Sequence, residues 1–522
     1  MKRPELKNLT IAQFFKEICK EHADTVALFD DRISFTYGEL DALTDKLAGG
    51  LYSCGIKKGD IVGLFSNTSV YGLVFFYALQ KINASVLFLP EKVHDEELVN
   101  YASLSEMRTI ICDYQHYDYF GNFDLIKRVE RKIIMTDDSR NEWIGMNDII
   151  SKGSDVNIDE LISSGDPQDT AVMLFTSGST GRPKIVCSSG YSKVNIGIQQ
   201  AFDMRYSKDD IVLGALPVHH CFSQSVNVLG AMATGIPLFI PDDRHSATII
   251  KALSEHHCTV MSAVPALYQA ILKNSDTDKS GIRLRTGVIG GGRYTPEQFC
   301  EIEEGFAPTF TLMSSLGMTE GTAGVTICEP DDSLEVRSKT LGHFMAYLDG
   351  KIINPYTHLE SPIGEVGEIC FKGYNVMQGY YKNPEATAEV IDKDGYLHSG
   401  DLAYIDEKGY IYLTGRLKDI IIRNGENITP KEIEDAIYLD PRVENCKVIG
   451  IEDDHLGEAV CACVVANKPM TEDEVKKLVA DKLVSYKVPS YVFFYDEFPL
   501  NSTGKIDSVQ LKETAREEVK KK

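Results

Sequence analysis

Short apolar runs that alternate with helical stretches constrain the fold of this chain more than any other feature. The runs IVGLF (61–65) and ASVLFL (84–89) flank a helical stretch, and similar units recur at TIICD, at VMSAVP followed by ALYQAIL, and at TGVIGGG followed by TPEQFCEI. Strands that alternate with helices in this way form parallel sheets with helices on both faces. The sequence therefore predicts doubly wound α/β sheets over most of its length.

The pattern changes beyond about Gly350. Short alternating runs punctuated by DG and KG turns, as in IDKDGYLHSGDLAYIDEKGYIYLTGR, predict hairpins and a small antiparallel barrel. After Arg416 a separate helix, strand, helix pattern (ITPKEIEDAIYL, ENCKVIGI, TEDEVKKLVADKL) predicts a small α+β domain. We therefore expect an α/β protein with a large multi-subdomain N-terminal region, residues 1–416, and a smaller C-terminal domain, residues 417–522.

Composition narrows the class of function. A net charge of -23 over 522 residues argues against nucleic acid or an anionic membrane surface as the main partner. The N-terminus turns polar too early for a signal peptide, and the most apolar stretch, Leu73 to Leu79, is too short for an integral membrane segment. The twelve cysteines are scattered, and the pair Cys461 and Cys463 lacks CxxC spacing. These features favour a cytoplasmic enzyme with a small-molecule substrate.

The stretch LFTSGSTGRPKIV (174–186) combines glycine and hydroxyl residues with a lysine, directly after an apolar run. Small residues let backbone N–H groups converge on an anion, hydroxyl groups add donors, and Lys184 adds positive charge. Phosphate is the natural ligand of such a loop. It is not a Walker loop, because Arg182 and Pro183 separate the last glycine from the lysine. Taken alone, the stretch is also compatible with a surface linker.

Six further motifs follow this loop in order. Together with the loop they make seven motifs: TSGSTGRPK, LPVHH, IGGG, SLGMTEG, GYLHSGD, GRLKDIIIRNGENITPKEIE and NSTGK. In the order and spacing of these motifs, the chain resembles the adenylate-forming acyl-CoA synthetase family over nearly its whole length. The resemblance implies two half-reactions: a carboxylate attacks the α-phosphate of MgATP to give an acyl-adenylate and pyrophosphate, and the thiol of coenzyme A then displaces AMP. The implied cofactors are ATP, Mg2+ and coenzyme A.

The resemblance also implies the nucleotide site. The loop would hold the β- and γ-phosphates through Thr176, Ser177, Gly178, Ser179, Thr180, Gly181 and Lys184. Thr319 matches the hydroxyl that contacts the α-phosphate, and Glu320, with Thr176, would bind Mg2+, which prefers oxygen ligands. Asp401 would accept the two ribose hydroxyls and Arg416 would contact ribose and phosphate. Gly290, Gly291, Gly292 and Leu316 would border the adenine.

Three positions near the C-terminus match the moving parts of the family. Lys505 in NSTGK matches the lysine that bridges the carboxylate and the α-phosphate, where its charge offsets charge developing in the transition state. Lys418 matches a hinge about which the C-terminal domain rotates between half-reactions, and the loop at Gly425 would then reach the pantetheine tunnel. An exposed charge in a linker is compatible with this role of Lys418, because a hinge needs no chemistry.

The adjacent His219 and His220 do not predict a metal site. Neighbouring residues project to different sides of regular structure, and no nearby Cys, Asp or His completes a zinc pattern. By the resemblance, His220 lies at the mouth of the acyl pocket beside the reacting carboxylate, and Phe222 lines the pocket. A pair of partly buried imidazoles is the simpler alternative.

Several positions depart from the family pattern. Leu316 replaces the usual aromatic that stacks on adenine, and Ile185 replaces a usual glycine, so ATP affinity and loop flexibility are in question. Ser188 with Ser189, and Tyr396 with Ser399, are further substitutions.

Alternative functions differ in the acid, in the acceptor, or in having no catalysis at all. In FSQS, Ser223 stands where amino-acid-activating domains carry an aspartate for the substrate ammonium, so simple acids are favoured over α-amino acids. Fatty, aromatic and sterol acids all fit the mixed apolar composition. The acceptor is coenzyme A or a carrier-protein thiol. A catalytically silent nucleotide or acyl-CoA binding module is a third alternative, which the retention of the motif residues speaks against.

Overall fold

The computed structural model describes residues 2–119, 126, 128–153, 155–177, 183–453, 455–499 and 506–521. Two compact units make up the chain: residues 1–349 with 371–397, and residues 350–370 with 398–522. The boundaries fall within three strands, β16 (Leu348–Ile353), β17 (Gly367–Gly373) and β19 (Leu397–Ile405). The chain therefore leaves the first unit, returns to it, and leaves it again.

The first unit contains a seven-stranded sheet in the order β18-β8-β7-β4-β3-β5-β6. β3, β4, β5, β6 and β7 pair in parallel, whereas β8 and β18 run antiparallel to their neighbours. The strands are β3 (Ile61–Phe65), β4 (Ser85–Phe88), β5 (Thr109–Cys112), β6 (Arg131–Ile134), β7 (Thr170–Ser177), β8 (Pro183–Ser189) and β18 (Gly379–Tyr380). The parallel pairing predicted for IVGLF, ASVLFL and TIICD is confirmed.

A nine-stranded sheet in the order β15-β14-β13-β12-β11-β9-β10-β1-β2 forms the rest of this unit. Its central strands are parallel, and β2, β14 and β15 are antiparallel at the two ends. The strands are β1 (Val26–Phe29), β2 (Ser34–Thr36), β9 (Val212–Leu213), β10 (Leu238–Phe239), β11 (Val260–Met261), β12 (Thr286–Ile289), β13 (Thr311–Met318), β14 (Ala323–Ile327) and β15 (His343–Phe344).

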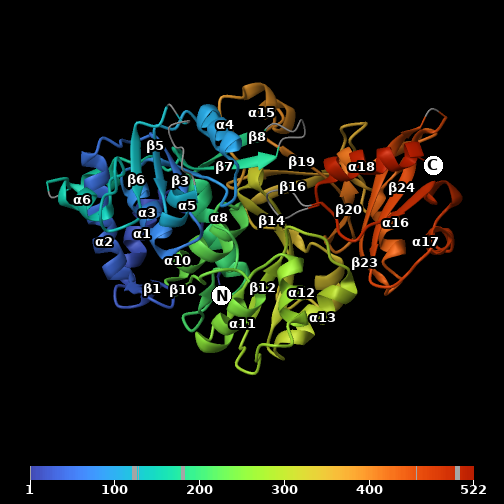
Figure 1. The fold of residues 1–522 in the computed structure, drawn as a ribbon, viewed down its shortest axis with the longest axis horizontal. Coiled ribbons are helices and arrows are strands. Elements are labelled where there is room, and N and C mark those ends of the chain that lie inside the picture. The colour runs from blue at the N-terminus through green and yellow to red at the C-terminus, as the bar shows by residue number, and fades with distance from the viewer. Residues whose placement is uncertain are drawn as a thin grey trace. The chain divides into compact units, whose positions relative to one another are not determined.

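Helices cover these sheets, as Figure 1 shows for β3, β5 and β6 with α3 beside them. The helices of the unit are α1 (Ile11–Glu21), α2 (Tyr37–Ser53), α3 (Val70–Lys81), α4 (Asp95–Ser105), α5 (Tyr114–Tyr119), α6 (Met146–Ser151), α7 (Ile158–Ser163), α8 (Gly190–Asp203), α9 (Cys221–Ser223), the π-helix η2 (Gln224–Leu229), α10 (Gly230–Thr234), α11 (Ser246–Glu255), α12 (Pro265–Lys273), α13 (Pro296–Phe306), the 3₁₀ turn η3 (Thr319–Gly321), α14 (Leu334–Lys339) and α15 (Pro384–Val390). The apolar stretch Leu73 to Leu79 is the buried centre of α3.

The second unit holds two sheets, of which one has the order β16-β17-β19-β20 and the other β22-β21-β24-β23 with β25 beside β24. The remaining elements are β20 (Ile411–Arg416), η4 (Leu417–Asp419), β21 (Ile421–Arg423), β22 (Glu426–Ile428), α16 (Pro430–Ile437), β23 (Val443–Asp453), β24 (Gly457–Ala466), α17 (Glu472–Ala480), η5 (Ser485–Lys487), β25 (Tyr491–Phe494) and α18 (Ser508–Lys521). The predicted helix, strand, helix pattern after Arg416 is α16, β23 and α17.

Alternation along β24 explains how this unit is layered. Val460, Ala462 and Val464 pack with α16 and α17, whereas Cys461 and Cys463 pack with α18. Successive strand residues point to opposite faces, so one strand fills two cores. Helices therefore cover both faces of the sheet, which agrees with the α+β prediction.

Helix α8 and the π-helix η2 approach each other unusually closely. A Cβ on Gly197 would lie 2.6 Å from the Cβ of Leu229, so a glycine is required at this crossing. Polar side chains are also buried along this contact, among them Lys193 and Gln224, and the Lys193 ammonium donates to Gln224 Oε1 at 2.8 Å. The described residues give Lys193 no carboxylate partner.

Burial lowers the pKa of Lys193 to about 8 from 10.5. Between these values the unfolded chain binds more protons than the folded one, so stability rises as pH rises through this window. At pH 7 the buried charge therefore costs about 3 kcal/mol. We expect Lys193→Met to remove this pH dependence and to stabilise the first unit at pH 7 by about 1 to 2 kcal/mol, since Gln224 loses a donor.

Unfolding followed at pH 7 and pH 10 tests this expectation. Lys208→Met, which replaces an exposed lysine, is the matched control. Equal stability of wild type and Lys193→Met at both pH values would show that the ammonium is not a destabilising charge.

Candidate active site

The predicted phosphate loop connects two antiparallel strands of the first unit. Strand β7 ends at Ser177 and β8 begins at Pro183, and Thr176 lies opposite Lys184 in the register. The predicted ligands Gly178, Ser179, Thr180 and Gly181 lie outside the described residues. The strand ends thus place one predicted hydroxyl and the predicted cation beside each other at the base of the loop.

Tyr380 connects this base to Glu320. The Lys184 ammonium lies 4.7 Å from the centre of the Tyr380 ring, and the Tyr380 hydroxyl donates to Glu320 Oε1 at 2.8 Å. The backbone N–H of Met377 also donates to the Glu320 backbone carbonyl at 2.8 Å. Burial, together with Glu320, raises the pKa of Tyr380, so the phenol stays protonated and donates to the carboxylate. A cation and a carboxylate are thereby held by one aromatic side chain.

Tyr380 was not predicted from the sequence. It lies in β18, which pairs with β8 through Tyr380 and Val186, so a segment almost two hundred residues later completes this site. No local pattern in GYYKN distinguishes a tyrosine that faces a carboxylate from one that packs in a core. The pairing of β18 with β8 is the signal, and it is visible only in three dimensions.

The HHCF segment lies next to Thr319. The Cys221 thiol donates to the Thr319 hydroxyl at 3.8 Å, which brings the segment that carries His220 to the start of η3. The ring centres of His219 and His220 are 4.3 Å apart. Burial, with His220 and Arg244 nearby, lowers the pKa of His219 well below its usual value, so this imidazole is neutral at pH 7.

An ion pair is linked through hydrogen bonds to the backbone just before these histidines. Arg244 pairs with Glu91, whose Oε1 accepts from the Thr68 hydroxyl at 3.1 Å. The Thr68 oxygen in turn accepts from the N–H of Val218 at 2.9 Å, immediately before His219. Side chains from separate segments therefore determine where the histidine pair lies.

The predicted adenine-side residues gather at the ends of β12 and β13. A Cβ on Gly290 would lie 3.4 Å from the Ser315 carbonyl and 3.9 Å from the Phe222 ring, so the glycine, β13 and the HHCF segment converge. Gly291 has a φ of +74°, which favours glycine, and Gly292 follows it in the turn before α13. Leu316 pairs with Thr326 on β14.

The second unit carries the predicted ribose contacts. Asp401 on β19 lies opposite Arg416 on β20, and Arg416 Nε donates to Asp401 Oδ1 at 2.9 Å. Asp401 is buried, whereas the Arg416 side chain is 55% exposed. The arginine therefore neutralises a buried carboxylate from its exposed side.

Glu368 holds the backbone just before Asp401, and sequence reasoning did not predict it. Its Oε1 accepts from the N–H of Gly400 at 2.8 Å, and its Oε2 lies 2.8 Å from His398 Nδ1. Gly400 has a φ of +72°. The signal in the sequence is a carboxylate inside the otherwise apolar run EICF, because a buried charge needs a partner.

The remaining predicted positions are also in the second unit. Lys418 is exposed in η4, directly after β20. Gly425 has a φ of +82° and, with Asn424 at +53°, forms the tight turn between β21 and β22. Lys505 lies outside the described residues.

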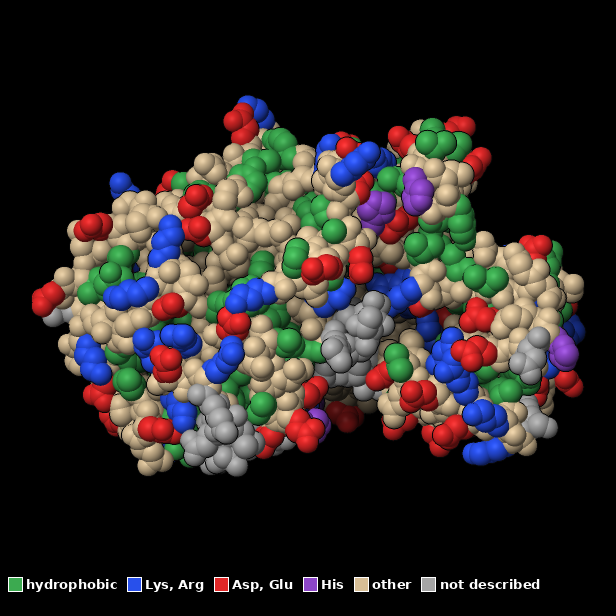
Figure 2. Space-filling view, turned by 90° about the horizontal axis from the view of Figure 1, so that it is seen from above, with side chains coloured by type: hydrophobic (Ala, Val, Ile, Leu, Met, Phe, Trp, Pro, Cys, Tyr) green, Lys and Arg blue, Asp and Glu red, His purple; other side chains and the backbone are tan. Residues whose placement is uncertain are grey.

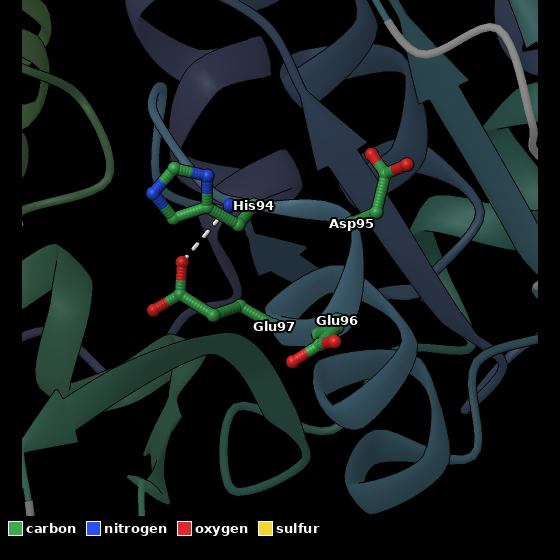
Figure 3. A pocket seen from close by; sticks show the side chains of 4 residues that line it. All are labelled: His94, Asp95, Glu96 and Glu97. Atoms are coloured by element: carbon green, nitrogen blue, oxygen red, sulfur yellow. Dashed lines mark hydrogen bonds between the residues drawn. The ribbon is translucent and has the colours of Figure 1, made fainter.

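A surface hollow lies elsewhere in the first unit, at the start of α4. It is lined by His94, Asp95, Glu96 and Glu97, and Figure 3 shows the bond from the His94 N–H to the Glu97 carboxylate. None of the predicted site residues lines it. Acidic and basic side chains are interspersed on the face shown in Figure 2. Among the described helices, none combines the length and the apolar character that a bilayer crossing requires.

Residues 15–381 match the model of the AMP-binding enzyme family, and residues 432–505 match that of the AMP-binding enzyme C-terminal domain. The chain is 31% identical to a putative acyl-CoA synthetase, YngI, of Bacillus subtilis, over 98% of this chain and 97% of the relative. It is 30% identical to the acyl-CoA ligase SID4 of Ajellomyces capsulatus, over 98% and 92%. The crystal structure of ATP-bound MatB from Rhodopseudomonas palustris superposes with a TM-score of 0.86 at 26% identity, covering 97% of this chain and 99% of that one.

Proposed function

The chain belongs to the AMP-binding enzyme family, and we propose that it is an acyl-CoA synthetase. It activates a carboxylic acid with ATP to form an acyl-adenylate, and then transfers the acyl group to coenzyme A. The observation that carries the proposal is the group of Lys184, Tyr380 and Glu320 at the base of the phosphate loop. The similarity to named acyl-CoA synthetases and to an ATP-bound structure supports it.

The side chains at the base of the phosphate loop are chemically suited to bind the triphosphate of ATP together with Mg2+. Lys184 provides positive charge for the β- and γ-phosphates, and Glu320 and Thr176 provide the oxygen ligands that Mg2+ prefers. When bound, Mg2+ neutralises charge on the phosphate oxygens. Tyr380 holds the Glu320 carboxylate through one oxygen, so the carboxylate keeps a fixed orientation. Thr319 would donate to the α-phosphate.

Asp401 and Arg416 are chemically suited to bind the ribose and phosphate of ATP. A carboxylate presents two oxygens to the vicinal ribose hydroxyls, and Arg416 would contact ribose and phosphate. Glu368, by fixing Gly400, keeps the Asp401 backbone in place. Gly290, Gly291, Gly292 and Leu316 would border the adenine, and the missing aromatic at Leu316 would weaken stacking.

Both half-reactions would use residues of the C-terminal domain, residues 417–522. We assign Lys505 to adenylation, Lys418 to the hinge, and Gly425 to the passage of the pantetheine arm. His220 and Phe222 would border the acid. The Ser223 hydroxyl donates to the Leu216 carbonyl at 2.8 Å and is buried, so this position offers no carboxylate to an α-ammonium. Fatty, aromatic or sterol acids remain the proposed substrate classes.

The test is pyrophosphate and AMP release by the purified protein with MgATP and a panel of acids, with and without coenzyme A. AMP and thioester formation with one acid class supports the proposal. Pyrophosphate release that coenzyme A does not affect indicates a carrier-protein acceptor. ATP binding without turnover for any acid indicates a silent nucleotide-binding module and contradicts the proposal.

We expect Tyr380→Phe to lower the adenylation rate about three- to tenfold and to raise the Mg2+ concentration needed for half-maximal rate. The change removes one hydrogen bond to a charged group, of which we expect about 0.7 to 1.4 kcal/mol to act in the transition state, and it leaves the ring under Lys184. Tyr381→Phe, one residue further on, is the matched control. Equal Mg2+ dependence of wild type and Tyr380→Phe would show that the phenol does not orient Glu320.

A further inference from the structure

Three side chains with different donor atoms meet between two adjacent strands of the second unit. Glu368 and Cys370 are two residues apart on β17, so they share a face of the strand, and His398 lies on the neighbouring strand β19. His398 Nδ1 is 2.8 Å from Glu368 Oε2 and 3.4 Å from Cys370 Sγ. The three donor atoms all lie within 4.8 Å of one another.

This donor set is that of a borderline-soft transition metal. Zn2+ binds imidazole nitrogen, thiolate sulfur and carboxylate oxygen with tetrahedral geometry, and sites with three protein ligands keep a fourth position for water. A thiolate disfavours Mg2+, which takes oxygen ligands. In the structure His398 Nδ1 and Glu368 Oε2 lie at hydrogen-bond distance, and a metal ion between them would take the place of the proton in this bond.

The surroundings of the three side chains suit a bound ion. Glu368 and Cys370 are buried, whereas the His398 side chain is 26% exposed and offers an entry path. The second carboxylate oxygen of Glu368 accepts from the N–H of Gly400, which fixes the carboxylate as an outer hydrogen bond fixes a metal ligand.

We propose that Glu368, Cys370 and His398 form a binding site for Zn2+ or Co2+, separate from the Mg2+ ligands Glu320 and Thr176. The imidazole coordinates through Nδ1 with its proton on Nε2, and the Cys370 thiol loses its proton to solvent. An ion here ties β17 to β19 three residues before Asp401. The proposal stands on the geometry of this unit and does not depend on the ligase reaction.

Titration of the full-length protein with Co2+ in excess Mg2+, followed by Zn2+, tests the site. We expect one equivalent of Co2+ to bind with thiolate-to-cobalt charge-transfer absorption, and Zn2+ to displace it. Cys370→Ser should abolish this absorption and weaken Zn2+ binding by at least about tenfold. Cys446→Ser, which replaces another buried cysteine of the same unit, should change neither.

His398→Asn is a second variant that tests the site even if the Cys370 variant does not fold. It changes a partly exposed side chain, and it should also weaken Co2+ and Zn2+ binding. Circular dichroism and thermal unfolding report whether each variant is folded. The proposal is wrong if the wild type shows no thiolate-to-cobalt absorption, if the absorption survives in folded Cys370→Ser, or if His94→Ala at the α4 hollow removes it. Because metal binding is measured directly, failure here is distinct from failure of the proposed ligase activity.

Discussion

Lys505→Ala is expected to lower acid-dependent pyrophosphate release by about two to three orders of magnitude. By this assignment the lysine would place positive charge against the carboxylate and α-phosphate oxygens as negative charge develops on them, and loss of such a contact costs about 3 to 4 kcal/mol in the transition state. Thioester formation from presynthesised acyl-adenylate and coenzyme A should stay close to the wild-type rate, because the lysine acts in the first half-reaction alone.

Comparison of the two half-reactions makes this test specific. Lys520→Ala, at an exposed position near the end of α18, is the control for general loss of positive charge in this domain. Equal losses in both half-reactions would indicate a folding defect. Unchanged adenylation would remove Lys505 from the site and leave the NSTGK resemblance without catalytic meaning.

The second large effect is expected for Glu320→Gln, which should lower adenylation about a hundredfold at ordinary Mg2+ concentrations. The amide keeps the shape and still accepts the hydrogen bond from Tyr380, so the change removes mainly the charge that attracts Mg2+. Raised Mg2+ or Mn2+ should recover part of the rate, since the remaining phosphate and hydroxyl ligands are intact.

Glu335→Gln, which changes an exposed carboxylate on α14, is the matched control for this substitution. Initial rates over a range of Mg2+ concentrations separate a weakened metal site from a lower maximal rate. A Glu320→Gln enzyme with the wild-type Mg2+ dependence would contradict the assignment of this carboxylate as a metal ligand.

The parallel sheets could be predicted because each strand, helix, strand unit is encoded locally. IVGLF became β3 and ASVLFL contains β4, and the helix between them, α3, is buried on all sides, as its uniform apolarity indicates. The sequence did not indicate that β18 would join β8, or that β1 would pair with β10. Such pairings join segments far apart in the chain, and no local periodicity reports them.

The same distinction holds within the candidate site. Residues inside motifs, such as Glu320 and Asp401, could be named because neighbouring residues mark them. Tyr380 lies in no motif, and Glu368 is marked only by its charge in an apolar run, since each acts on a motif from a segment that is separate in the sequence. A motif thus predicts the groups expected to contact substrate, whereas the side chains that orient those groups come from the tertiary fold.

The π-helix η2 has a consequence for how the sequence can evolve. A π-helical turn contains one residue more than an α-helical turn, so it is equivalent to a single-residue insertion within a helix. Deleting one residue between Gln224 and Leu229 would let α9 and α10 join as one regular helix, and the HHCF segment would keep roughly its angle about the helix axis relative to Leu229, because the wider π-turn already accommodates the extra residue. The chain can therefore lose one residue at this point without rotating the HHCF segment relative to α10, so a change in length here is better tolerated than one within a regular helix.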